Sequence, residues 1–245
     1  MNTSSNVYVM GFAIGVCVVI SAALAVTANW LKPTQDAAAE FDRQKNVMMA
    51  AGLVKADDSR LRPELEKLYK DRVEEFVVDT EAGTVAAGKT VADVAAMKSV
   101  ADKLRYRVVA QSKDAAGKPE SYILPISGKG LWSTIYGYIA LEGDLTHVRG
   151  VTFYKHGETP GLGGEVENPE WTALWKGKSI LDEQGHLVGI GVKKGRVDPT
   201  IPAEKAHKVD GLSGATITSN GVTKFVKNDL TAFEKYLTSL RSKRQ

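Results

Sequence analysis

The chain has 245 residues, with 32 Lys and Arg against 29 Asp and Glu and a formal net charge of +3. This near balance, without a basic block or a basic stripe interleaved with aromatic residues, argues against nucleic-acid binding. The only cysteine, Cys17, lies in an apolar run, and the four histidines are dispersed along the chain. A disulfide framework, a zinc site and an iron–sulfur site built by this chain alone are therefore excluded, and no metal site is expected.

The first part of the chain is an apolar segment. No charged residue occurs from Met1 to Leu31, and residues 7–28 are almost entirely apolar. As a helix that rises about 1.5 Å per residue, this stretch is about 33 Å long, enough to cross a hydrocarbon core of about 30 Å. We therefore expect residues 1–6 to form a tail and residues 7–31 to form one transmembrane helix.

A cleaved signal peptide is the alternative for this segment, because "ALA" at residues 23–25 is similar to a cleavage site. The length of the apolar stretch and the absence of a preceding Lys or Arg favour a permanent anchor. Lys32, Arg43 and Lys45 follow the segment, so the positive-inside rule weakly places the following domain in the cytoplasm. That rule loses force for long domains, and the orientation stays open at this level.

Residues 32–245 are expected to form one soluble domain, which starts with a juxtamembrane helix over residues 32–55. A second helical pattern follows over residues 61–73, where Pro63 is tolerable in the first turn. Trp171 and Trp175, four residues apart, indicate a buried helix face rather than a cofactor site.

Beyond residue 105 the pattern changes to β-rich runs separated by Gly, Pro and Asp, which predicts a sheet built largely of hairpins. These runs cover residues 105–112, 121–127, 131–143, 147–156 and 186–195. The last segment, residues 219–240, spaces its apolar side chains as an amphipathic helix. The fold class that follows is α+β, with a largely antiparallel sheet and flanking helices behind one N-terminal anchor.

The stretch Gly83–Thr90, "GTVAAGKT", matches the pattern of a phosphate-binding P-loop. Taken literally, it predicts a membrane-tethered NTPase. Asp79, Thr80 and Glu81 stand between the preceding apolar residues and the first glycine, where they would bring two carboxylates toward the triphosphate. A solvated loop is the simpler interpretation.

A corner rich in glycine and hydroxyl groups, "DGLSGATITS", leads into the predicted terminal helix. Gly211, Gly214 and the small Ala215 would let a ligand approach the main chain closely. The helix N-terminus would supply unpaired N–H groups and the positive end of a dipole, with Thr218 or Ser219 as its cap. Such a corner suits a phosphate.

No Lys or Arg occurs between Lys208 and Lys224, although a freely exchanging dianion would call for a cation. A phosphate held there by a covalent bond is therefore worth considering. A capped helix start after a tight turn is the alternative that local reasoning alone favours.

Three motifs in order along the chain resemble one family of membrane FMN proteins. They are "GKGLW" at residues 128–132, "GETPGLGGEV" at 157–166 and "DGLSGATITSNGV" at 210–222. Together with the N-terminal apolar segment, they resemble the C subunits of the Na+-translocating NADH:quinone reductase over effectively the whole chain. The G subunits of the related Rnf complex are the nearest alternative, and the residues of the motifs "GKGLW" and "DGLSGAT" favour the quinone reductase.

The resemblance implies that Thr216 carries FMN through a phosphoester bond, which a separate flavin transferase installs with FAD as donor. A phosphodiester carries one charge, which glycine amides and a helix dipole could accommodate without a cation. Glycine-rich loops of the family surround the flavin. The other implied cofactor-binding residues are Gly130, Leu131, Trp132, Glu158, Thr159, Pro160, Gly161, Leu162, Gly163, Asp210, Gly211, Leu212, Ser213, Gly214, Ala215 and Thr218.

The family also implies a role in electron transfer. Electrons would pass between an iron–sulfur centre and another flavin in neighbouring subunits, with the domain on the periplasmic side of a bacterial inner membrane, which overrides the charge-based orientation. No catalytic acid, base or nucleophile is expected in turnover, because the cofactor performs the chemistry.

Neither NADH nor quinone is expected to bind, and the lack of a G-x-G-x-x-G fingerprint agrees for NADH. Sodium movement is assigned to multi-span subunits, since one uncharged helix offers no ion path. A P-loop NTPase and a cofactor-free anchored binding protein are the alternative functions.

Overall fold

The structure is a computed structural model that describes residues 5–243, so residues 1–4 of the expected tail lie outside the described residues. The chain forms two compact units, residues 1–42 and residues 43–245. Helix α1 (Asn6–Ala50) is long and apolar enough to cross a membrane by length and composition, and its most apolar window has a mean hydropathy of 2.6. It continues through Pro33, so the expected anchor and the helix after it are one element.

Helix α1 ends at Ala50, short of the expected residue 55, because the chain turns left-handed at Gly52, where φ is +69°. The amide of Leu53 donates to the carbonyl of Met48 at 2.9 Å, and the amide of Gly52 donates to that of Met49 at 3.0 Å. This pairing is a Schellman motif, in which glycine takes the left-handed position without a steric penalty.

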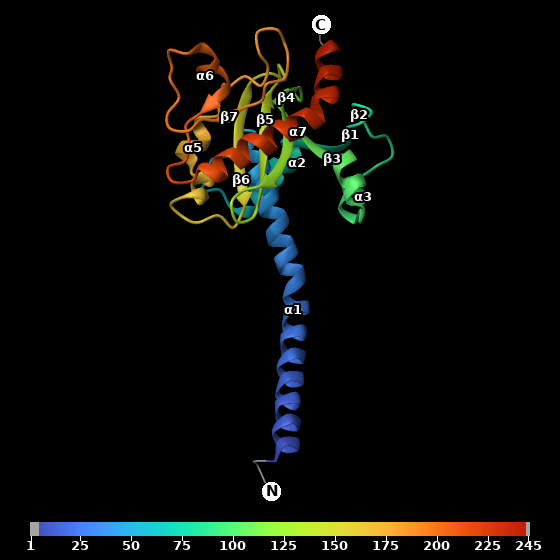
Figure 1. Ribbon diagram of the computed structural model, residues 1–245. Coiled ribbons are helices and arrows are strands. Elements are labelled where there is room, and N and C mark those ends of the chain that lie inside the picture. Colours follow the sequence, from blue (N-terminus) through green and yellow to red (C-terminus); the bar gives the residue numbers. More distant parts are fainter. Residues whose placement is uncertain (1–4, 244–245) are drawn as a thin grey trace. The chain divides into compact units, whose positions relative to one another are not determined.

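The second unit is built on one six-stranded antiparallel sheet in the order β2-β1-β3-β4-β5-β6, visible in Figure 1. From β3 to β6, strands that follow one another in sequence also pair with one another, which confirms the predicted hairpin sheet. The strands are β1 (Val73–Asp79), β2 (Thr84–Val85), β3 (Tyr106–Lys113), β4 (Pro119–Lys129), β5 (Thr134–Glu142) and β6 (Val148–Lys155).

The β-rich run at residues 186–195 departs from the prediction. Only Gly191–Val192 forms a strand, β7, and it pairs parallel with β8 (Lys208–Val209) outside the main sheet. The apolar residues of this run are used for packing instead, since Ile190 and Val192 are buried in the common core.

The P-loop interpretation of Gly83–Thr90 is contradicted by the hairpin that the segment forms. Strand β2 folds back antiparallel on β1, with Val85 opposite Val78. Thr90 is the N-cap of the short helix α3, and its Oγ1 donates to Asp93 Oδ2 at 2.8 Å. A P-loop needs a strand that runs straight into the phosphate-binding turn and a hydroxyl free for Mg²⁺, and neither is present here.

Short helices connect and flank the sheet. The predicted helix at residues 61–73 is confirmed as α2, with Pro63 in its first turn. The helices are α2 (Arg62–Arg72), α3 (Val91–Ala96), α4 (Val100–Arg105), the 3₁₀ helix η1 (Gly163–Glu167), α5 (Pro169–Ala173), α6 (Pro202–His207) and α7 (Thr216–Ser242).

The terminal helix α7 lies across the sheet, as Figure 1 shows in red. Its apolar face, including Phe225, Leu230 and Phe233, is buried in one core with sheet residues such as Leu124 and Ile139. Burying each such side chain contributes about 1.5–3 kcal/mol, so this interface is a main source of stability. The predicted amphipathic helix is confirmed.

The two tryptophans expected on one buried helix face are both buried, but α5 ends at Ala173, so Trp175 lies beyond the helix. The Trp171 and Trp175 rings meet edge to face at a centroid distance of 5.6 Å, and Phe153 of β6 packs against both. Edge-to-face pairs of this kind add to the stabilisation that burial gives.

A buried ion pair fastens α7 to the sheet. Arg107 of β3 donates to Asp229 Oδ1 at 2.6 Å, and the amide of Ser127 on β4 donates to Asp229 Oδ2 at 2.7 Å. Asp229 is buried and its partner nearly so. The carboxylate is thus compensated by a cation.

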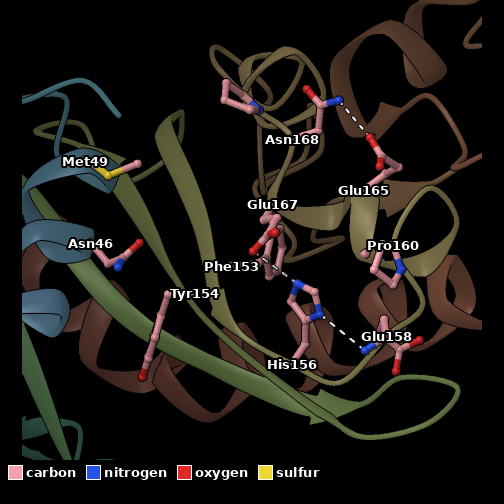
Figure 2. Close-up of a pocket in the computed structure, with 12 residues that line it drawn as sticks. Asn46, Met49, Phe153, Tyr154, His156, Glu158, Pro160, Glu165, Glu167 and Asn168 are labelled. Carbon is pink, nitrogen blue, oxygen red and sulfur yellow. Dashed lines mark hydrogen bonds and ion pairs between the residues drawn. The ribbon is translucent and has the colours of Figure 1, made fainter. Parts of the chain in front are cut away.

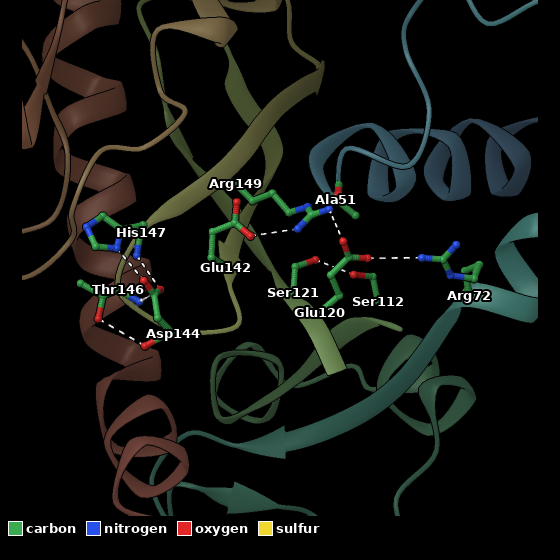
Figure 3. Close-up of polar contacts among 10 residues, drawn as sticks. All are labelled: Ala51, Arg72, Ser112, Glu120, Ser121, Glu142, Asp144, Thr146, His147 and Arg149. Atoms are coloured by element: carbon green, nitrogen blue, oxygen red, sulfur yellow. Dashed lines mark hydrogen bonds and ion pairs between the residues drawn. The ribbon is translucent and has the colours of Figure 1, made fainter. Parts of the chain in front are cut away.

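A second ionic network holds the segment after α1 on the sheet (Figure 3). Arg149 of β6 donates to the carbonyl of Ala51 at 2.6 Å, to Glu142 at 2.9 Å and to Glu120 at 2.5 Å. Arg72 adds a longer ion pair to Glu120 at 3.3 Å. Again each carboxylate faces a guanidinium.

Candidate functional site

The hydroxyl-rich corner ends where α7 begins. Thr216 is the first residue of the helix, and Ala215 occupies the N-cap position without a side-chain capping bond. The prediction that Thr218 or Ser219 caps the helix is therefore wrong, because both residues lie inside its first turn. Thr216 is exposed, so its hydroxyl stands at the positive end of the helix dipole and open to solvent.

The two buried hydroxyls of the first turn are used within the fold. Thr218 Oγ1 donates to Glu158 Oε2 at 2.7 Å, and Ser219 Oγ accepts from the amide of Leu212 at 3.4 Å. Ser213, in contrast, is exposed like Thr216. Thr216 and Ser213 are thus the two exposed hydroxyls of the corner.

Glu158, in the loop between β6 and η1, connects this helix turn to the "GKGLW" loop. Its Oε1 accepts from the amides of Trp132 at 2.9 Å and Ser133 at 3.1 Å, and its Oε2 accepts from the amide of Leu131 at 3.1 Å. With the Thr218 hydroxyl, the carboxylate has four donors from two other segments of the chain. All three sequence motifs therefore meet at one side chain.

The environment keeps Glu158 ionised. The residue is only 5% exposed. Burial by itself would raise the pKa of its carboxyl, but the hydrogen bonds from Thr218 and the three amides outweigh burial and hold the pKa below its ordinary value of 4.5. Within residues 5–243, no Lys, Arg or His forms an ion pair with this carboxylate.

Glycines let the three segments come this close. A Cβ at Gly130 would lie 2.6 Å from Glu158 Oε1, and a Cβ at Gly163 would lie 2.7 Å from Thr218 Oγ1. Gly214 has a φ of +68°, and a Cβ there would meet Leu162 at 2.8 Å. These positions exclude any other residue without a local shift, so the glycine-rich composition of the motifs serves loop packing.

The "TPGLG" segment forms a tight exposed turn. The carbonyl of Thr159 accepts from the amides of Leu162 at 3.1 Å and Gly164 at 2.9 Å. Gly161, at the tip, has a φ of +74°, and Pro160 beside it is exposed. The turn presents its outer surface to solvent, as a ligand-contacting loop requires.

Apolar side chains stand exposed on these same segments. Trp132 is 67% exposed and Ile217 60%, and Leu131 and Leu162 are also exposed. Isolated exposed apolar residues are ordinary, but these four lie on two loops and the first turn of α7, which are joined through one carboxylate, and such a set suits contact with a flat apolar group. We call these four residues the apolar rim. Ile217 was not among the expected site residues, because helical spacing alone did not mark it.

Asp210 and Gly211 connect the corner to neighbouring segments of the chain. Asp210 Oδ1 accepts from the amide of Val197 at 2.8 Å, and its carbonyl accepts from Trp171 Nε1 at 2.8 Å. A Cβ at Gly211 would lie 2.2 Å from the carbonyl of Lys193. Both residues therefore hold the corner against neighbouring segments.

The turn at residues 193–196 lies against the corner and carries two exposed cations, which the sequence reasoning missed. The amide of Gly211 donates to the carbonyl of Gly195 at 2.7 Å, beside the exposed Lys194 and Arg196. Neither cation has a hydrogen bond or ion pair with the described part of the chain. The parallel pairing of β7 with β8 causes this approach, and two-residue strands leave no readable sequence pattern. Lys129, in the "GKGLW" loop, donates to the carbonyl of Trp132 at 3.1 Å.

A pocket of about 570 Å³ is lined by Glu158 and Pro160 of this loop together with residues of α1, β6 and η1 (Figure 2). There the amide of Glu158 donates to His156 Nδ1 at 3.3 Å, and His156 Nε2 lies 3.3 Å from Glu167 Oε2. These contacts connect the loop to β6 and η1 through His156. No group of three or more His, Cys, Asp or Glu within residues 5–243 is placed to hold a metal ion.

Comparisons with known proteins agree with this geometry. Residues 130–231, which contain the second and third motifs and the last three residues of "GKGLW", match the family model of an FMN-binding domain. The chain is 38% identical to the C subunit of the Na(+)-translocating NADH-quinone reductase of Pseudomonas aeruginosa, over 98% of each chain. It is 37% identical to the protein of the same name from Yersinia pestis, over 84% of this chain and 81% of that one.

Two solved structures are also similar. The crystal structure of Shewanella oneidensis NqrC is 32% identical, with a TM-score of 0.69, over 84% of this chain and 99% of that one. The crystal structure of the corresponding C subunit from Parabacteroides distasonis is 30% identical, with the same TM-score, over 85% and 97%. With this identity over nearly its whole length, the chain belongs to the family of C subunits of the Na+-translocating NADH-quinone reductase.

Proposed function

We propose that the protein is an electron-transfer subunit that carries FMN as a phosphoester on Thr216. The observation that carries this proposal is the exposed Thr216 hydroxyl at the first turn of α7, with both glycine-rich loops held against that turn through Glu158. The FMN-binding domain model, which spans this site, supports the choice of cofactor.

The described residues fit the cofactor. The first turn of α7 offers amide donors and a dipole end to a phosphate, and Lys194 and Arg196 add positive charge near the corner. The apolar rim, which comprises Leu131, Trp132, Leu162 and Ile217, suits a planar ring. When bound, the flavin supplies redox chemistry, and the protein sets its position, potential and access.

Attachment would use Thr216 as a nucleophile once, during maturation by a separate flavin transferase. The Thr216 oxygen forms a bond to the FMN phosphorus of FAD, the pyrophosphate bond breaks, AMP leaves and the hydroxyl proton is released. The protein gains one FMN less one water. No side chain of this protein is then required as an acid or base in turnover.

The partners proposed are the iron–sulfur and flavin-bearing subunits of the same complex, between which the protein passes electrons. Helix α1 anchors the chain in a bacterial inner membrane, with the FMN-binding domain in the periplasm. Proteolysis of spheroplasts checks this orientation, since it digests a periplasmic domain and leaves a cytoplasmic one intact.

Expression with and without a flavin transferase tests the attachment. Denatured wild-type protein should fluoresce on a gel and show the mass gain only when the transferase is present. Thr216→Ala should abolish both signals, whereas Thr216→Ser, which keeps a hydroxyl at the same position, should keep them. An unmodified wild-type chain in a host that flavinylates other proteins would overturn the proposal.

A further inference from the structure

The Glu158 carboxylate differs from an ordinary buried acid in that only neutral groups hold it. Its four donors are three backbone amides and the Thr218 hydroxyl, and no cation among residues 5–243 compensates it. Thr218 is two residues after Thr216 in the same helical turn. A fixed negative charge therefore lies at the base of the proposed flavin site.

The geometry requires an acceptor-only side chain at this position. Each carboxylate oxygen receives two donors, and an ionised carboxylate offers acceptor sites alone. A glutamine would place an NH₂ group opposite either the amide of Leu131 or the amides of Trp132 and Ser133, so one set of donors would lose its acceptor. A Cβ at Gly130 would lie 2.6 Å from Oε1 and a Cβ at Gly163 would lie 2.8 Å from Oε2, so the two glycines leave room for the carboxylate. The ionised form of Glu158 is therefore required for all four hydrogen bonds that join the loops to α7.

We propose that Glu158 is a positioning residue that holds both glycine-rich loops on α7 and, through its uncompensated charge, keeps the reduction potential of the bound flavin low. This inference rests on the proposed function, since it needs FMN on Thr216. Reduction adds negative charge to the flavin, and a fixed anion nearby opposes that addition. Water and salt screen the interaction poorly because Glu158 is 5% exposed.

The decisive experiment is a redox titration of the flavinylated full-length chain in detergent, for wild type and Glu158→Gln. We expect the one-electron reduction equilibrium of Glu158→Gln to favour the reduced flavin at least tenfold more, a shift of about 59 mV to more positive potential. The matched control is Glu165→Gln, which removes a partly buried carboxylate in η1 of the same motif; its Oε2 accepts from Asn168, and it accepts no hydrogen bond from the "GKGLW" loop or from α7. Its potential should equal that of the wild type.

A milder pair of variants keeps the test valid if Glu158→Gln does not fold. Thr218→Val removes one donor but leaves the charge, which is then less neutralised, so the flavin potential should shift to a more negative value. Thr218→Ser keeps the hydroxyl and should restore the wild-type potential. A purely structural carboxylate would lower the melting temperature of both Glu158→Gln and Thr218→Val without these opposite shifts.

The outcomes separate the two proposals. If mass spectrometry finds no covalent flavin on the wild-type chain, the proposed function itself is contradicted. Covalent flavin with an unchanged potential in Glu158→Gln, or in Thr218→Val where Glu158→Gln does not fold, overturns this inference and leaves the attachment intact. Shifts of opposite sign in the two variants support it.

Discussion

Two buried carboxylates do different work in this domain. Asp229 fastens α7 to the middle of the sheet and faces the guanidinium of Arg107, so its charge is compensated where it lies. Glu158 fastens the start of the same helix to two loops, yet its partners are amides and a hydroxyl. Four neutral donors keep the Glu158 carboxylate ionised but leave its negative charge without a counter-ion at the proposed cofactor site, which points to a functional reason.

Breaking the compensated pair should have the largest effect on stability. Asp229→Ala leaves the Arg107 cation and the Ser127 amide without their shared acceptor, and removal of one partner of a buried pair costs about 3–5 kcal/mol. Urea unfolding measures this loss. At a temperature where the variant is folded, flavin attachment should be normal, because Thr216 lies at the start of α7 and Asp229 lies in the middle of the helix.

The double variant Arg107→Met with Asp229→Leu is the control for this prediction. It removes both charges and replaces them with apolar side chains, which is often neutral for stability. A double variant as unstable as Asp229→Ala would show that packing, and not the lone charge, dominates at this position.

A smaller loss of stability, together with a loss of flavin attachment, is expected when the packing around Glu158 is disturbed. In Gly163→Ala the new Cβ would lie 2.7 Å from Thr218 Oγ1 and 2.8 Å from Glu158 Oε2. Overpacking of this kind costs about 1–3 kcal/mol and should also reduce flavin attachment, because it separates the loops from α7. Unfolding and in-gel flavin fluorescence on the same samples measure both effects.

Gly191→Ala is the matched control for Gly163→Ala. Its Cβ would meet nothing closer than 3.8 Å, so stability should change by less than about 0.5 kcal/mol and attachment not at all. Equal behaviour of the two alanine variants would contradict the idea that close packing around Glu158 forms the site.

The sheet and the terminal helix could be predicted from the sequence, since alternating apolar runs and the 3.6-residue spacing of residues such as Phe225 and Phe233 follow directly from burial on one face. The start of α7 could not. Thr218 and Ser219 look like capping residues, but their hydroxyls bond elsewhere and the helix begins two residues before Thr218, at Thr216.

The candidate site was predicted by motif resemblance and not by local physics. Nothing in the sequence pairs Glu158 with a helix that begins at Thr216, because long-range contacts of one side chain leave no periodic pattern. The same limit hid the Lys193–Arg196 turn, which reaches the corner through a two-residue parallel pairing. Local pattern also misled at Gly83–Thr90, where a P-loop pattern folds as a hairpin.

The response to acid should be weaker still than the effect of Gly163→Ala. Hydrogen bonds hold the pKa of Glu158 below its ordinary value of 4.5, so in acid the unfolded chain binds a proton that the folded chain does not. The stability that Glu158 contributes is therefore fully present above about pH 4.5 and is lost as the pH falls through the lower folded pKa. Urea unfolding across this range should show a positive slope of stability with pH that is smaller in Glu158→Gln than in the wild type and unchanged in Glu165→Gln.

The smallest effect on stability, and none on attachment, is expected from the apolar rim. Trp132 and Ile217 are 67% and 60% exposed, so replacing either with Ala should change the free energy of unfolding by less than about 0.5 kcal/mol. If the rim covers the flavin, each variant should make its fluorescence more accessible to iodide quenching. Leu174→Ala, at an exposed apolar residue after α5, should leave quenching unchanged. If quenching in both rim variants equals that of the wild type, the flavin ring does not lie against the apolar rim. Attachment at Thr216 would then be independent of the loops that Glu158 holds on α7.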